Sequence, residues 1–531
     1  MVPETASGEE RRRMSQSSGA ARVQQAAGLI VYAGYLYFRN RLDPQAWRKV
    51  AGSGRMLLLP PQNDTSFRQP TRRSRVRPPL NNSLIESTGS FRPMMRLALP
   101  VLVEQTLSLL VFFSDTTLAG QFLEQRHLTA MTLVAYLMWF VPNIFMLVAV
   151  GSTAVVARCI GAGDRQTAAH ATNQSLMLGA VLAAIAMICV YLGIRPLTTA
   201  MGLDQPDVAP LIDQYMTIVV IAIPGIMLTQ IGPACLRGAG DMKSGMFAMT
   251  VVNIINVALG WAFIKGWFGL PVLGWQGLAI ATAVGHWVGG LIILVLLFRG
   301  RAGLKLTRAH LRFDRQMCRR ILRIGIPGGG DVITVILCHL WFLSIVTRLG
   351  DVPAAAHGVA IRIEALAYLP GHAFQMAAAT LAGQYLGARD YHRAGRSVTL
   401  ALLVGGSIMC IAGLAFFFAG EYLVLIMVEP SKSGVIEVAT GLLQIVAVAM
   451  PALAVSMILA GALRGAGDTR WPLLFTLIGL LGVRIPFAYW LAAESMFGIE
   501  GAWYAMVADV WVRCLLIGYR FVHGGWKMIE V

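Results

Sequence analysis

The sequence has few charged residues for its length. Only 13% of its 531 residues are Asp, Glu, Lys or Arg, and 56% are apolar before glycine is counted. A soluble domain carries about 25% charged residues. Long soluble chains divide into domains with polar exteriors, so a soluble fold cannot hide this much apolar surface. The scarcity of charge therefore excludes an ordinary soluble enzyme and a disordered chain, and it predicts an integral membrane protein.

The sequence also lacks the motifs that usually carry covalent or metal chemistry. Its seven cysteines form no Cys-x-x-Cys motif and show no metal-site spacing with histidine. It contains no phosphate-binding loop and no set of residues typical of a nucleophile with its general base. We therefore expect no enzymatic activity, no disulfide scaffold and no bound cofactor.

Long apolar segments recur from residue 97 onward. A transmembrane helix takes about 20 apolar residues, whereas barrel strands are shorter and alternate in polarity. The apolar run Ala26–Phe38 is too short to span. We predict an all-α integral membrane protein with twelve transmembrane helices, at 96–119, 130–157, 172–193, 211–235, 245–265, 275–298, 324–347, 354–381, 397–419, 436–462, 471–491 and 500–521.

Basic residues outnumber acidic residues by 44 to 27, and their positions predict the orientation. Loops on one side of the predicted spans hold 20 basic residues, and loops on the other side hold 5. The positive-inside rule places the richer side in the cytosol, together with both termini. A cytosolic flank also explains the basic N-terminal segment better than nucleic-acid binding does, so we expect no nucleic-acid partner. The expected location is the plasma (bacterial inner) membrane.

An internal repeat divides the sequence into two halves. The segment PACLRGAGDMK at 233–243 recurs as AGALRGAGDTR at 460–470. Six crossings return the chain to the same side, so both halves have the same topology, as in parallel-repeat transporters. One offset of 227 residues relates Pro224 to Pro451, Arg237 to Arg464, Asp241 to Asp468 and Glu104 to Asp331.

The repeat predicts the domain organisation. Two six-helix lobes enclose a central cavity and rock about it, and we expect a monomer surrounded by membrane lipid. The predicted parts are a basic, disordered cytosolic extension at 1–91, an N-lobe at 92–298, a basic cytosolic linker at 299–323 and a C-lobe at 324–531.

The repeated polar residues predict a structural hinge at the cytosolic ends of helices 4 and 10. Glycine allows tight turns and close helix packing, and arginine can pair with acidic groups there. Proline within a helix kinks it. The predicted hinge residues are Arg237, Arg464, Asp241, Asp468, Pro224 and Pro451.

Ionisable residues inside the predicted spans indicate function, because a lone charge in the membrane is costly. Asp115 in helix 1 is the leading candidate for a site that binds a proton or Na⁺. Glu104 lies about 16 Å earlier along the same helix. Glu104 and Asp331 form a repeat-related pair of further candidates. In the alternative interpretation, Asp115 stands at the end of the helix and caps the next segment.

Other residues in the spans are candidates to line a cavity, although each alone is more often part of a packed core. Asp509 and Arg513 are an i,i+4 pair that can neutralise each other, which favours a structural role. The cavity candidates are Gln105, Asn253, Asn256, Tyr136, His357 and Glu364.

Across about residues 92–525 the sequence resembles the multidrug and toxic-compound extrusion (MATE) family. The resemblance rests on LPVLVEQ…SDTTLAG in helix 1, ARCIGAGDRQTA after helix 2, CLRGAGDMK after helix 4 and NIINVALGWAFIKGWFGLPVLGWQGLAIATA over helices 5 and 6. The second half adds AAHGVAIRIEALAYLPGHAFQMAAATLAGQYLGARD and ALRGAGDTRWP.

The resemblance implies two six-helix lobes and export of organic, often cationic, compounds driven by entry of H⁺ or Na⁺. It also implies that Asp115 is the acidic residue of helix 1. The sequence departs from the family pattern at two positions that bear on the identity of the coupling ion. Gly260 stands where some branches carry an acidic residue, and Asp331 lies nearer the start of helix 7 than the glutamate of other branches.

We therefore predict a cation-coupled antiporter of small organic compounds. One alternative is a flippase for lipid-linked precursors, which a wide, hydrophilic and cationic cavity would favour. Another is a membrane sensor that does not transport, which would need a patterned N-terminal domain, and the first 90 residues show no such pattern.

Overall fold

The computed structural model describes residues 91–531 except for 201–205, 308–311 and 495–496. The chain divides into two units, residues 1–77 and 78–531, and every described residue belongs to the second. Apart from Phe91, the predicted extension at 1–91 lies outside the described residues.

The N-lobe is helical over each of the first six predicted spans. The second span is two helices that meet at Phe145, just after Pro142. The N-lobe helices are α3 (Phe91–Phe122), α4 (Gln125–Ile144), α5 (Met146–Gly161), α6 (Arg165–Ala200), α7 (Ala209–Gly238), α8 (Lys243–Lys265) and α9 (Trp275–Phe298).

The C-lobe is helical over the remaining six predicted spans. The tenth span is bent by 55° between α13 and α14. The eleventh contains two π-helical segments, η4 (Ile478–Arg484) and η5 (Trp490–Glu494). The α-helices are α10 (Arg315–Thr347), α11 (Asp351–Gly387), α12 (Tyr391–Leu425), α13 (Ser433–Ala447), α14 (Met450–Gly465), α15 (Arg470–Leu477), α16 (Ile485–Tyr489) and α17 (Gly498–His523).

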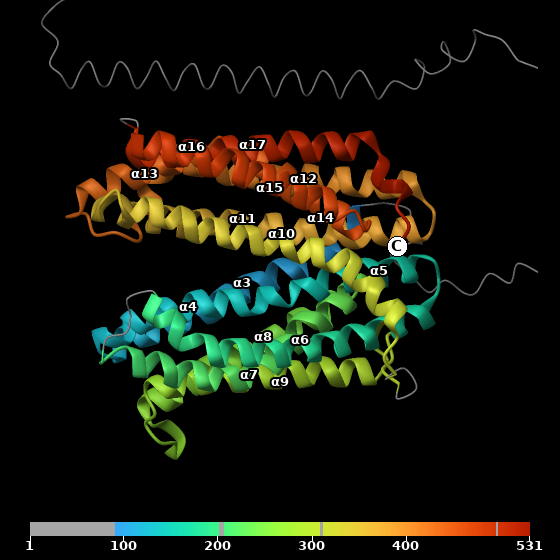
Figure 1. Cartoon of the computed structure of the whole chain (residues 1–531), viewed down its shortest axis with the longest axis horizontal. Helices are drawn as coiled ribbons and strands as arrows, with labels where there is room; N and C mark the ends of the chain where they lie inside the picture. Colours follow the sequence, from blue (N-terminus) through green and yellow to red (C-terminus); the bar gives the residue numbers. More distant parts are fainter. Residues whose placement is uncertain (1–90, 201–205, 308–311, 495–496) are drawn as a thin grey trace, which may run out of the picture. The chain divides into compact units, whose positions relative to one another are not determined.

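These helices confirm the all-α architecture of twelve spans in two lobes. In the described part of the chain, nine helices are long and apolar enough to cross a membrane, and the bent pair α13–α14 makes a tenth. Helices α11 and α17 complete the twelve, although polar and charged residues interrupt their apolar runs. Figure 1 shows α3–α9 gathered in one group and α11–α17 in another.

Four tight turns with related sequences mark one end of the lobes. They lie at residues 161–164, 238–241, 387–390 and 465–468, and we call this end the GAGD end. Gly163, Gly240 and Gly467 have positive φ angles of 80°, 88° and 89°. Arg389 takes the same place in the fourth turn with φ 60°. The left-handed backbone explains why glycine recurs at this position, because glycine adopts it without steric strain.

The first helix of each lobe begins among the helices of the other lobe. Leu97 of α3 packs in a cluster with Phe374 of α11, and Ile321 of α10 packs in a cluster with Val148 of α5. Helix α10 starts at Arg315 and not at residue 324, so the end of the predicted linker is helical. Asp314 caps this helix by accepting hydrogen bonds from the backbone N–H groups of residues 316 and 317.

Candidate functional site

A buried polar cluster around Asp115 joins four helices of the N-lobe. The Thr282 hydroxyl of α9 donates a hydrogen bond to Asp115 Oδ2 at 3.0 Å. Asn256 of α8 donates to the Thr282 Oγ1 atom, also at 3.0 Å. Tyr215 of α7 is buried within electrostatic reach of Asp115. The cluster thus places the Thr282 hydroxyl against one oxygen of the Asp115 carboxylate and the Asn256 amide against that hydroxyl.

Two oxygen atoms of this cluster are left without partners. Asp115 Oδ1 and Asn256 Oδ1 are both buried and accept no hydrogen bond from any described residue. A buried polar atom without a partner carries a desolvation penalty of about 1–3 kcal/mol. Asp115 lies inside α3, which continues to Phe122, so the interpretation of Asp115 as a helix-end cap is wrong. An arrangement of this kind can accept a proton or a small cation.

Glu104 and Asp331 form equivalent ion pairs in the two lobes. Arg237 Nη1 lies 2.9 Å from Glu104 Oε1, and Arg464 Nη1 lies 3.1 Å from Asp331 Oδ2. The first pair links α3 to α7, and the second links α10 to α14. All four side chains are largely buried. Each carboxylate is therefore neutralised by an arginine, unlike Asp115.

The remaining predicted hinge residues also lie in related places. Asp241 forms an ion pair with Arg301, with 2.6 Å between Oδ2 and Nε. Asp468 forms an ion pair with Arg520, with 2.9 Å between the same two atoms. The two prolines differ, because α7 continues through Pro224 whereas Pro451 opens α14 directly after the 55° bend.

The C-lobe contains a buried charge network next to the π-helical segment. Asp509 pairs with Arg513 at 2.8 Å and with Arg484 at 3.0 Å. Glu364 of α11 is buried within electrostatic reach of Arg484 and Tyr368. Nε and Nη1 of Arg484 are buried and have no hydrogen-bond partner in the described part of the chain. Glu364 is thus part of a cluster that mixes both signs of charge.

Three other predicted cavity residues lie outside the Asp115 cluster. Asn253 donates to the Met249 carbonyl within α8, and Gln105 is half-buried on α3. His357 accepts a hydrogen bond from the Trp503 indole in the C-lobe at 3.2 Å. The Tyr136 side chain lies outside the described residues.

Thr282 and Tyr215 are site residues that the sequence analysis missed. Thr282 is the one polar residue in the apolar stretch 277–284, and this was the only signal that could have identified it.

Contacts between the lobes close the GAGD end. Arg158 of α5 donates to the carbonyl oxygens of Ala466 and Ile529, at 3.0 Å and 2.8 Å. Gln384 and Thr380 of α11 donate to carbonyl oxygens at the end of α7, at 2.9 Å and 3.1 Å. Asp115 lies about 16 Å along α3 from Glu104, away from this closed end.

The model of the MatE family matches the chain twice, at residues 100–262 and at residues 327–490. Together these matches cover more than half of the chain. The chain belongs to the MATE family. The two matches begin at Pro100 and Pro327, which confirms the internal repeat, and they identify the molecule as a MATE transporter with multiple membrane passes.

Curated relatives and solved structures agree with this assignment. The transporter is 27% identical to a "Probable multidrug resistance protein NorM" of Thermotoga maritima, over 82% of this chain and 93% of that protein. It is 28% identical to a "Multidrug resistance protein NorM" of Burkholderia vietnamiensis, over 80% and 92%. Its fold matches that of a multidrug resistance MATE family transporter in an outward-facing conformation, with a TM-score of 0.77, 20% identity and coverage of 83% and 97%.

Proposed function

We propose that this transporter exports organic compounds, often cationic, in exchange for an ion that binds at Asp115. The observation that carries the proposal is the buried Asp115 carboxylate, with one oxygen held by Thr282 and the other without a partner in the described structure. A carboxylate inside the membrane indicates function by default, because an unpaired charge there is costly. The names of the relatives support an organic cargo.

The cluster supports binding of either H⁺ or Na⁺. A proton adds to the carboxylate and needs no further ligand. Sodium needs several oxygen ligands, and the unpartnered oxygens of Asp115 and Asn256 are two candidates. Glu104 and Asp331 fit a structural role better, because each already has an arginine partner.

Ion binding drives transport only if it favours one conformation over the other. We infer that an ion entering from the end remote from the GAGD turns binds at Asp115 and favours release of the closed contacts between the lobes. The distribution of basic residues supports a cytosolic GAGD end, cytosolic termini and a plasma-membrane location. We expect the lobes of a single chain to suffice, so the transporter acts as a monomer.

Inverted membrane vesicles test this proposal. We expect a fluorescent cationic dye to accumulate when either a pH gradient or a Na⁺ gradient is imposed, and the effective gradient identifies the ion. Vesicles without the transporter are the control. No response to either gradient would reject antiport, and translocation of a lipid-linked precursor instead would support the flippase alternative.

A further inference from the structure

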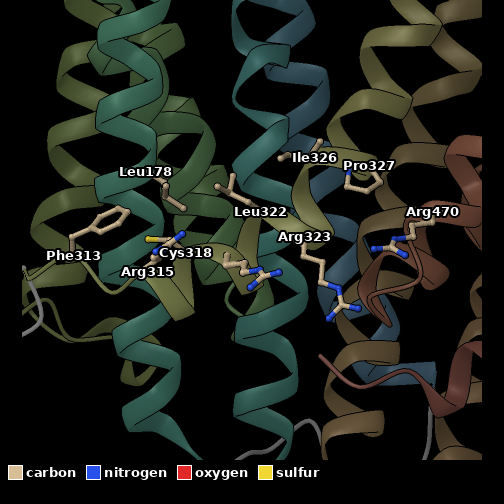
Figure 2. Close-up of a pocket in the computed structure, with 10 residues that line it drawn as sticks. Leu178, Phe313, Arg315, Cys318, Leu322, Arg323, Ile326, Pro327 and Arg470 are labelled. Carbon is tan, nitrogen blue, oxygen red and sulfur yellow. The ribbon is translucent and has the colours of Figure 1, made fainter.

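A basic cavity of about 550 Å³ lies at the start of α10, where the lobes meet at the GAGD end. Its walls come from the N-lobe helix α6, from α10 and from α15 (Figure 2). The lining residues are Leu178, Phe313, Arg315, Cys318, Arg319, Leu322, Arg323, Ile326, Pro327 and Arg470.

The four arginines of the cavity share one side of the structure. Arg315, Arg319 and Arg323 lie at intervals of four residues, which places them on one face of α10. Arg470 opens α15. None of the four forms an ion pair with any residue that the structure describes.

This arrangement is unfavourable for the empty protein. Like charges four residues apart destabilise a helix by a few tenths of a kcal/mol per pair. The N-terminus of a helix carries partial positive charge, so cations in its first turns are unfavourable and an anion is favourable. Both α10 and α15 begin at the cavity. A bound anion would remove each of these penalties.

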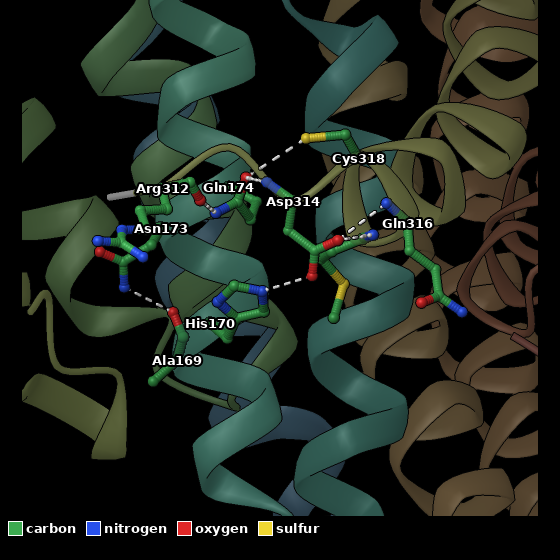
Figure 3. Close-up of polar contacts among 9 residues, drawn as sticks. Ala169, His170, Asn173, Gln174, Arg312, Asp314, Gln316 and Cys318 are labelled. Atoms are coloured by element: carbon green, nitrogen blue, oxygen red, sulfur yellow. Dashed lines mark hydrogen bonds and ion pairs between the residues drawn. The ribbon is translucent and has the colours of Figure 1, made fainter. Parts of the chain in front are cut away.

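The carboxylate nearest in sequence does not supply that anion. Asp314 faces His170 of α6, whose Nε2 lies 2.9 Å from Asp314 Oδ2 (Figure 3). Its other oxygen accepts the two backbone hydrogen bonds that cap α10. These hydrogen bonds, with the one from His170 as the largest effect, hold the pKa of Asp314 below its usual range. Asp314 is therefore ionised, but His170 and the backbone N–H groups at the helix start already engage both of its oxygens.

Two apolar residues of the cavity, Ile326 and Pro327, follow the three arginines of α10 along the helix. Ile326 and Pro327 follow Arg323 by three and four residues, which is about one helical turn along α10 (Figure 2). Phe313, which lies just before α10, and Ile326 are 62% and 56% exposed. The cavity thus offers four cationic side chains together with exposed apolar surface at Phe313 and Ile326.

The length of α10 places this cavity at the membrane surface. Its 33 residues extend about 50 Å, whereas the hydrocarbon core is about 30 Å thick. The first turns therefore reach the head-group region. Basic pockets between transmembrane helices at this depth suit anionic lipid head groups.

We propose that the cavity binds an anionic phospholipid, with its phosphate among the four arginines and an acyl chain along Leu178, Leu322 and Ile326. Leu178 belongs to the N-lobe and the arginines belong to C-lobe helices, so the lipid contacts both lobes. Bound lipid thereby favours the conformation in which the GAGD end is closed. The positive-inside rule explains why basic residues gather at the GAGD end, but it does not require them to surround a cavity with apolar walls.

A binding experiment with the full chain tests the proposal. Detergent-purified transporter is titrated with phosphatidylglycerol or phosphatidylcholine, and retained lipid is measured by native mass spectrometry. Each basic residue near an anionic lipid contributes about fivefold in affinity. We expect the variant Arg315→Gln/Arg319→Gln/Arg323→Gln to bind phosphatidylglycerol on the order of a hundredfold more weakly, and phosphatidylcholine to bind weakly in either case.

The control removes the same charge from the same end of the protein. Arg299→Gln/Lys305→Gln/Arg396→Gln changes three exposed residues that do not line the cavity, and it should bind lipid as wild type does. Equal loss in both triple variants would reject a specific site. Equal competition by inorganic phosphate would show a site for a soluble anion instead of a lipid. Each triple variant must elute as a single species in size-exclusion chromatography, and Arg470→Gln provides a milder test with an expected loss of about fivefold.

Discussion

Asp115 and Thr282 are joined by a hydrogen bond of 3.0 Å, although 167 residues separate them in the sequence. The bond connects the first helix of the N-lobe to the last one and leaves Asp115 Oδ1 without a partner in the described structure. We expect Asp115→Asn to reduce ion-driven dye export at least about tenfold, because an amide cannot bind a proton as a carboxylate does. Transport in inverted vesicles measures this effect.

The control for Asp115→Asn is Asp213→Asn, which removes a carboxylate that pairs with the exposed Arg195 on the surface. This variant should export dye at the wild-type rate. Both variants should elute as folded protein, because the asparagine in Asp115→Asn has nearly the volume of aspartate. Wild-type export by Asp115→Asn would contradict the proposed ion site.

The pair Glu104–Arg237 should contribute to stability and not to ion coupling. Breaking a buried ion pair from one side costs about 3–5 kcal/mol, because a charge remains buried without its partner. We therefore expect Glu104→Gln and Arg237→Gln each to lower the thermal unfolding midpoint. The double variant should lower the unfolding midpoint by less than the sum of the two single decreases, because it leaves no lone buried charge.

An exposed pair gives the comparison for Glu104. Glu124 and Arg126 lie 2.8 Å apart with side chains that are 69% and 48% exposed, so Glu124→Gln should change stability by no more than about 1 kcal/mol. Loss of ion coupling in Glu104→Gln without any loss of stability would favour the opposite role, as a second ion site.

The positions of the spans and the repeat could be predicted from the sequence, because they depend on local apolar length and on one constant offset. The start of α10 could not. Hydropathy places the start of the span at residue 324, whereas the helix begins at Arg315 behind the Asp314 cap and includes the arginine-rich turns. Charged residues at a membrane surface look like a loop in sequence, although they are helical here.

The partners of the site residues were harder to predict. The repeat related Glu104 to Asp331 and Arg237 to Arg464, yet it gave no reason to pair a carboxylate with an arginine 133 residues away. The structure shows that both lobes make this pair at the same separation. Thr282 carries no charge and belongs to no repeated motif, so its contact with Asp115 depends entirely on how α3 and α9 pack.

Arg158 should control how firmly the GAGD end is closed. Its Nη2 atom donates to two carbonyl oxygens of the C-lobe, and a hydrogen bond from a charged group is worth about 1.5–3 kcal/mol. A loss of about 2 kcal/mol changes the ratio of closed to open forms roughly 30-fold. We expect Arg158→Ala to increase the population in which this end is open.

Spin labels at residues 164 and 389, in GAGD turns of opposite lobes, measure this change as a longer distance. The labels require a background without the seven native cysteines. Arg396→Ala, at an exposed position, should leave the distances unchanged. An unchanged distribution in Arg158→Ala would show that the remaining contacts close this end without Arg158.

Gly325 and Gly330 allow a test of the lobe contact within a single helix. A Cβ atom on Gly325 would collide with the Leu147 carbonyl of α5, whereas one on Gly330 would meet only Leu473 Cδ2 at 4.0 Å. Alanine in place of glycine favours a helix by up to about 1 kcal/mol, so Gly330→Ala should be neutral or stabilising. Overpacking costs about 1–3 kcal/mol, so Gly325→Ala should separate α10 from α5 and open the GAGD end. The same pair of spin labels and a thermal unfolding curve measure both effects. If Gly325→Ala and Gly330→Ala behave alike, helix propensity and not close packing determines the result, and α10 then does not hold the lobes together at this point.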